Sequence, residues 1–127
     1  MDGFCCRCLR RITHIPSAFH RVSNDEIFRR ARVTRLSQVL LDRQLNYLHK
    51  LANLPNDSQL RASIFVPGSF HLSSPDGGRR VGRPRAEWGE RVWRAALEVT
   101  GGEATLRQFL IGNASTWRNE VAKRLVV

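Results

Sequence analysis

Three cysteines near the start of the chain, at positions 5, 6 and 8, have the side-chain type for metal or thiol chemistry. Cys5 and Cys8 show the C-x-x-C spacing of many zinc ligand pairs. Zinc fingers place such a pair on a turn, whereas these two cysteines fall within a helical pattern. The alternative is that they are small, weakly polar core residues. We therefore expect no bound metal or other cofactor, and Cys5 and Cys8 remain the candidate ligands if one binds.

Two other places have residue types that serve in acid–base chemistry. Asp25 and Glu26 are adjacent carboxylates, but Ser23 stands three residues before Glu26, which is a capping-box pattern at the start of a helix. His49 lies inside a long helical pattern without a nearby partner in sequence, as structural histidines usually do. The sequence contains no complete catalytic constellation. We therefore expect a protein that is not an enzyme and has no small-molecule substrate.

The strongest chemical signal is the basic segment 77–85, GGRRVGRPR, which contains no acid. Its glycines and proline favour an open loop, so its charges must stay in water or meet a polyanion. Trp88 follows and could stack on a base, although it also begins the apolar face of a predicted helix. The candidate nucleic-acid-binding residues are Arg79, Arg80, Arg83, Arg85 and Trp88.

Three interpretations of segment 77–85 remain open. Its arginines could neutralise phosphates of DNA or RNA and release counterions. The Gly-Arg-Pro core could insert into a narrow minor groove as an AT-hook does, although Val81 stands where such a hook has an arginine. The segment could also be a solvated linker that needs no partner.

The whole chain is strongly basic. It has 127 residues, of which 21 are Lys or Arg and 11 are Asp or Glu, giving a formal net charge of +10. Only Lys50 and Lys123 are lysines, and the planar guanidinium of arginine is well suited to bidentate phosphate contacts. This charge favours a polyanionic partner, and we expect RNA or DNA contacted mainly through phosphates.

The sequence also predicts where the protein is found. No apolar run approaches the roughly 20 residues that cross a bilayer. Arginines at positions 7, 10 and 11 interrupt any signal-peptide core. Three cysteines are an odd number, which argues against a secreted disulfide framework. We expect an intracellular protein, nuclear or cytoplasmic, that is neither secreted nor bound to a membrane.

Helical periodicity recurs along most of the chain. In the first segment it places Phe4, Cys5, Cys8 and Ile12 on one inward face. Two short apolar runs around Pro67-Gly68 are consistent with a hairpin. The pattern predicts a mainly α fold of about five helices, one possible β-hairpin and a basic Gly/Arg/Pro loop. The helical segments are 2–15, 24–31, 35–53, 86–99, 104–111 and 116–125.

The length fits a single small helical domain or fragment covering residues 1–127. Residues 1–57 form N-terminal helices, and 58–85 contain the hairpin and the basic loop. Residues 86–127 form C-terminal helices. In the longest helix, 35–53, the apolar stripe predicted to face inward includes Leu36, Leu40, Leu45, Tyr47 and Leu48.

Four segments resemble, in the same order, the region after the reverse-transcriptase domain in polyproteins of non-LTR (LINE-type) retrotransposons. Residues 4–12 are similar to that family's Cys-Arg-Cys-Leu-Arg helix, and 22–31 to its Asn-Glu-containing helix start. Residues 36–51 resemble its Arg/Leu/Trp-rich helix, and 78–88 its closing Gly-Arg-Pro and Trp motif. The resemblance covers roughly residues 1–99. One departure is Tyr47-Leu48-His49, where the family has a glycine before the histidine.

The resemblance implies a fragment of a retrotransposon reverse transcriptase that lies after the polymerase core. The paired metal-binding aspartates of the polymerase palm do not occur in this sequence, so the implied role is a non-catalytic tail that grips RNA or DNA. The polymerase core of a parent polyprotein would be a further partner. The alternative is a degenerate, orphaned reading frame that survives as an inert or protein-interaction helical domain.

Overall fold

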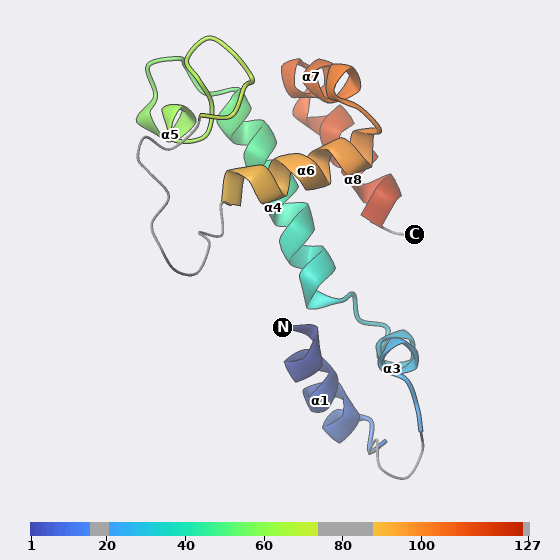
Figure 1. Ribbon diagram of the computed structural model, residues 1–127. Coiled ribbons are helices and arrows are strands. Elements are labelled where there is room, and N and C mark those ends of the chain that lie inside the picture. The colour runs from blue at the N-terminus through green and yellow to red at the C-terminus, as the bar shows by residue number, and fades with distance from the viewer. Residues whose placement is uncertain (16–20, 74–87, 126–127) are drawn as a thin grey trace. The chain divides into compact units, whose positions relative to one another are not determined.

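The computed structural model describes residues 1–15, 21–73 and 88–125. These ranges contain seven helices and no sheet, so the prediction of a mainly α fold is confirmed (Figure 1). The chain divides into two compact units, residues 1–41 (the first unit) and 42–127 (the second unit). No helix in the described ranges has the length and apolar character needed to cross a bilayer.

The first unit is built around two helices that pack against each other, α1 (Asp2–Ile12) and α3 (Asn24–Ala31) (Figure 1). Ser23 is the N-cap of α3, and its Oγ accepts a hydrogen bond of 3.2 Å from the backbone N–H of Glu26. This confirms the predicted helix start. The buried core of the unit consists of Cys6, Ile27 and Phe28.

The inward face predicted for α1 was wrong for Phe4 and Ile12. Their side chains are 66% and 72% exposed, whereas Cys6 is buried. Phe4 and Cys6 are two residues apart, which places them about 200° apart around a helix, so both cannot face the same partner. Helix α3 presents Ile27 and Phe28 to the Cys6 side, and this contact selects the buried face.

The second unit contains the C-terminal part of α4 (Leu36–Ala52) together with α6 (Trp88–Thr100), α7 (Glu103–Ile111) and α8 (Ala114–Leu125). Helices α6, α7 and α8 pack on one another (Figure 1). Gly101, with a φ of +77°, takes the left-handed conformation that separates α6 from α7. The largest fully buried side chains of this unit are Leu45, Leu48, Phe65, Val92, Leu106, Leu110, Trp117 and Val121.

The possible hairpin of the sequence is reduced to one isolated antiparallel bridge between Phe65 and Leu72. The backbone N–H of Val66 donates to the carbonyl of His71 at 2.8 Å, and Gly68 has a φ of +76° in the connecting turn. A short helix, α5 (Gln59–Ala62), precedes the bridge and was not predicted. Because α5 takes Ala62 into a helical turn, too few residues remain for a regular first strand.

The predicted inward stripe of α4 was wrong at three positions. Leu36, Leu40 and Tyr47 are exposed, while Leu45 and Leu48 are fully buried. The stripe in the sequence is wider than the arc that one set of neighbours can cover, so part of it faces out.

Candidate nucleic-acid interface

Four of the five predicted nucleic-acid-binding residues, Arg79, Arg80, Arg83 and Arg85, lie outside the described residues. The fifth, Trp88, is half-buried at the first position of α6. Its ring meets that of Tyr47 edge to face, with the centroids 5.9 Å apart. Trp88 therefore helps to join α6 to α4 within the second unit.

The second unit contains a groove between α4 and α8, with a volume of about 750 Å³. Arg43 and Lys50 line it from α4, and Arg118 lines it from α8. All three side chains are exposed, and none forms an ion pair with another described residue. The remaining polar lining includes one carboxylate, three amides and an imidazole: Asp42, Asn46, Asn53, Asn113 and His49. We call this feature the α4/α8 groove.

The base of the α4/α8 groove is held by hydrogen bonds within the protein. Nε1 of Trp117 donates to the carbonyl of Leu45 at 3.1 Å, and the indole stacks on His49 with ring centroids 6.0 Å apart. His49 Nε2 lies 3.3 Å from the carbonyl of Gly112, an arrangement in which the ring donates. These bonds fix α8 against α4, so the groove is a preformed feature of the second unit.

The electrostatics of the α4/α8 groove favour an anion. Among the described residues that line the groove, Asp42 is the only one with a carboxylate, and that side chain accepts a hydrogen bond of 3.1 Å from Nδ2 of Asn46. Asp42 forms no ion pair with Arg43, Lys50 or Arg118, so the three cations keep their charge available. Positive side chains around a concave surface focus the field and raise the local concentration of anions.

Sequence reasoning missed this groove, although one signal was present. Arg43, Asn46, Lys50 and Asn53 recur at intervals of three and four residues, which places polar side chains along one face of a helix. Such a stripe is also typical of a solvated surface. The opposite wall, residues 112–118, lies 62 to 68 positions further along the chain than Lys50 and is brought there only by folding.

The candidate metal ligands Cys5 and Cys8 are both half-buried on α1. Cys5 packs against the core of the first unit, and the neighbouring Cys6 donates its thiol proton to Asn24 Oδ1 at a sulfur–oxygen distance of 3.0 Å. Across the described ranges, no group of three or more His, Cys, Asp or Glu side chains is arranged to hold a metal ion.

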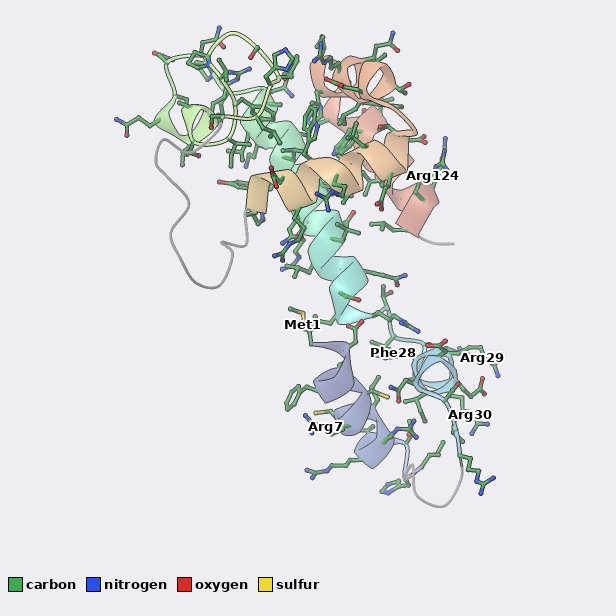
Figure 2. All side chains as sticks on the ribbon, in the orientation of Figure 1. Met1, Arg7, Phe28, Arg29, Arg30 and Arg124 are labelled. Atoms are coloured by element: carbon green, nitrogen blue, oxygen red, sulfur yellow. The ribbon has the colours of Figure 1, made fainter. Side chains whose placement is uncertain are left out.

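The adjacent carboxylates Asp25 and Glu26 are engaged by arginines. Glu26 forms ion pairs with Arg29 at 2.6 Å and with Arg30 at 2.7 Å, and Asp25 pairs with Arg35. Arg29 and Arg30 project from α3 on the side away from α1 (Figure 2). These pairs neutralise part of the basic surface of the first unit, and those arginines are therefore less available to a polyanion.

The two arginines should make Glu26 unusually acidic. Hydrogen bonds from Arg29 and Arg30 lower the pKa of Glu26 from 4.5 to about 2. Because the folded-state pKa is depressed, the stabilisation is present above pH 4.5 and is lost as the pH falls towards 2. We expect NMR titration of the Glu26 carboxyl carbon to show a midpoint of about 2.

The control for this titration is the double variant Arg29→Gln and Arg30→Gln, in which the Glu26 midpoint should move up towards 4.5. Concentrated salt should shift the wild-type midpoint in the same direction, because the pairs are exposed and screened. An unshifted wild-type midpoint near 4.5 would show that the ion pairs do not persist in solution.

A scan of protein-family models finds no match to the chain, and neither do the searches of curated proteins and of solved structures.

Proposed function

We propose that this chain is a non-catalytic nucleic-acid-binding protein that contacts the phosphates of RNA or DNA through arginine and lysine. The observation that supports it is the surplus of unpaired cations. In the described ranges, nine exposed cations form no ion pair, against three exposed carboxylates that form none. The nine cations are Arg7, Arg11, Arg21, Arg32, Arg43, Lys50, Arg91, Arg94 and Arg118.

The basic segment 77–85 adds four further arginines without an acid among them. Contacts of this kind release counterions from the nucleic acid, so affinity falls steeply with salt. They read no base sequence, and we expect binding with little sequence preference.

The origin that we propose is the tail of a non-LTR retrotransposon reverse transcriptase. Four ordered segments support it, covering residues 4–12, 22–31, 36–51 and 78–88. In that setting the tail would help to hold template and primer, and the polymerase core would be a second partner.

The proposal is tested by replacing Arg79, Arg80, Arg83 and Arg85 together with glutamine. Each lost phosphate contact lowers the slope of log affinity against log salt by about 0.7 on single strands and about 0.9 on duplex DNA. We therefore expect a clearly shallower slope in a fluorescence-anisotropy titration from low to moderate salt.

A matched control removes the same charge from the first unit by replacing Arg7, Arg11, Arg21 and Arg32 with glutamine. If the four arginines of segment 77–85 contact phosphate, the control should change the slope less. Equal slopes in the two variants would leave segment 77–85 as a linker. A wild-type chain that binds neither single-stranded RNA nor duplex DNA at low salt would refute the proposed function.

A second candidate, a protein-interaction domain, is favoured by one observation. Phe4 and Ile12 of α1 are largely exposed and lie eight residues apart, on one face of that helix. Exposed apolar side chains grouped in this way are typical of contact surfaces. Loss of all nucleic-acid binding in the titration above would favour this candidate.

A further inference from the structure

We infer that the α4/α8 groove binds an unpaired nucleotide of a single-stranded nucleic acid. This inference rests on the proposed function and assigns it to a defined site. The cations of the groove would bind the phosphates. The ring of Tyr47, which is 46% exposed at the groove, would stack on the base.

The size of the groove suits this ligand. Its volume of about 750 Å³ falls within the range of roughly 300–1,000 Å³ that is typical of small-molecule and cofactor sites. A base inside a duplex has both faces stacked and its pairing edge occupied, so only an unpaired base can reach such a cavity.

The cations form two opposing walls. Arg43 and Lys50 are seven residues apart on α4, which places them two turns and about 10 Å apart along one face. Arg118 belongs to α8, on the other wall. The start of α8 at Ala114 also lines the groove, and the partial positive charge of a helix N-terminus adds to that of the side chains.

The neutral polar groups indicate which surfaces remain for a ligand. Asn53 Nδ2 is committed to the carbonyls of His49 at 2.8 Å and Leu110 at 2.9 Å, so this amide is structural. Asn113 lines the groove, and its side chain forms no hydrogen bond with another described residue. Its amide can both donate and accept, which matches the edge of a base.

The combination of cations, a free amide and an exposed aromatic ring decides between anionic partners. An acidic peptide would satisfy the cations alone and would leave the ring of Tyr47 and the amide of Asn113 without a specific role. A nucleotide has an anionic phosphate, a flat base and hydrogen-bonding edges, so it fits all three. We therefore assign the groove to nucleic acid.

The first experiment compares two double variants of equal charge. Lys50→Gln with Arg118→Gln removes two cations from the groove, and Arg91→Gln with Arg94→Gln removes two exposed cations from α6. Each is titrated with a short single-stranded RNA and with a duplex DNA of equal length. We expect the groove variant to bind the single strand about tenfold more weakly than the α6 variant does, with equal losses on the duplex.

The second experiment tests the stacking. Tyr47→Leu removes the aromatic face and keeps an apolar side chain, whereas Tyr47→Phe keeps the ring. We expect Tyr47→Leu to weaken single-strand binding about tenfold, and Tyr47→Phe to bind as the wild type does. Photocrosslinking of wild-type protein to a 5-iodouracil oligonucleotide, mapped by mass spectrometry, should give an adduct at Tyr47. Equal thermal midpoints for the variants exclude unfolding as the cause.

The outcomes of these experiments test the groove and the proposed function separately. Wild-type binding that both double variants weaken equally, with no adduct at Tyr47, overturns the groove and leaves the proposed function standing. Absence of any wild-type binding overturns both. Displacement of a bound oligonucleotide by polyglutamate, with the same dependence on Lys50 and Arg118 but none on Tyr47, would assign the groove to an acidic peptide instead.

Discussion

Replacing Trp117 with alanine should lower the free energy of unfolding of the second unit by about 3–5 kcal/mol, the usual cost of truncating a large buried aromatic side chain. The side chain is 1% exposed and is the largest buried one in this unit. It contacts two other helices: α4, through its bond to Leu45 and its stacking on His49, and α7, through Phe109. A cavity at this junction cannot close without shifting α8 relative to α4 and α7.

The measurement is urea unfolding followed by tryptophan fluorescence. All three tryptophans lie in the second unit, so the signal reports that unit, and Trp93 remains as a probe in the variant. The control is Trp88→Ala, at a half-buried residue, with an expected loss of about 1–2 kcal/mol. A loss for Trp117→Ala no larger than that of the control would contradict the packing described for α4 and α8.

The same variant bears on the groove. Trp117 forms its base together with His49, so Trp117→Ala should weaken single-strand binding as well as stability. Trp117→Phe keeps a ring at the junction and should retain most of the binding. This comparison shows how far the groove depends on the position of α8.

Replacing Arg61 with alanine should cost about 3 kcal/mol, because several hydrogen bonds from a charged group are lost and their acceptors stay buried. Arg61 is 4% exposed and has no carboxylate partner in the described ranges. Its guanidinium instead donates to the carbonyls of Ser69 at 2.8 Å and of Ala52 and Val66 at 3.4 Å. It also lies over the rings of two phenylalanines, at 5.6 and 5.8 Å.

Residues 61–73 form no sheet, and the hydrogen bonds of Arg61 hold this segment together. One planar group with several donors joins the end of α4 to both sides of the turn, which a single antiparallel bridge could not stabilise. Arg61→Lys keeps the charge but loses the planar fork, so we expect it to lose most of the same stability. The measurement is again urea unfolding by tryptophan fluorescence.

The control for Arg61 is Arg91→Ala, a change at an exposed arginine of the same unit, with an expected effect within about 0.5 kcal/mol. If Arg61→Lys unfolds at the same urea concentration as the wild type, the charge alone is sufficient and the bonds to the three carbonyls contribute little. If Arg61→Ala lowers the free energy of unfolding no more than Arg91→Ala does, the buried position described for Arg61 is wrong.

The two basic features of the chain have different characters. Segment 77–85 was recognised from composition alone, since four arginines without an acid need no folding to attract phosphate. The α4/α8 groove has fewer cations but holds them around a cavity with an amide and an aromatic ring. Binding of nucleic acid by segment 77–85 should depend mainly on the salt concentration. Binding by the α4/α8 groove should also depend on whether the nucleic acid is single-stranded or a duplex.

The sequence by itself determined the helical class, the cap at Ser23 and the basic character of the surface. These follow from local rules, because periodicity, capping and charge depend on residues within a few positions of one another. Only the tertiary structure decided which face of α1 is buried, that Arg61 lies inside, and that Arg118 faces Lys50 across a groove. The face of α1 and the groove depend on contacts between residues distant in sequence, and such contacts override a pattern that fits more than one face. The burial of Arg61 depends on how the turn after α5 folds back onto the end of α4, which a helical or strand periodicity does not show.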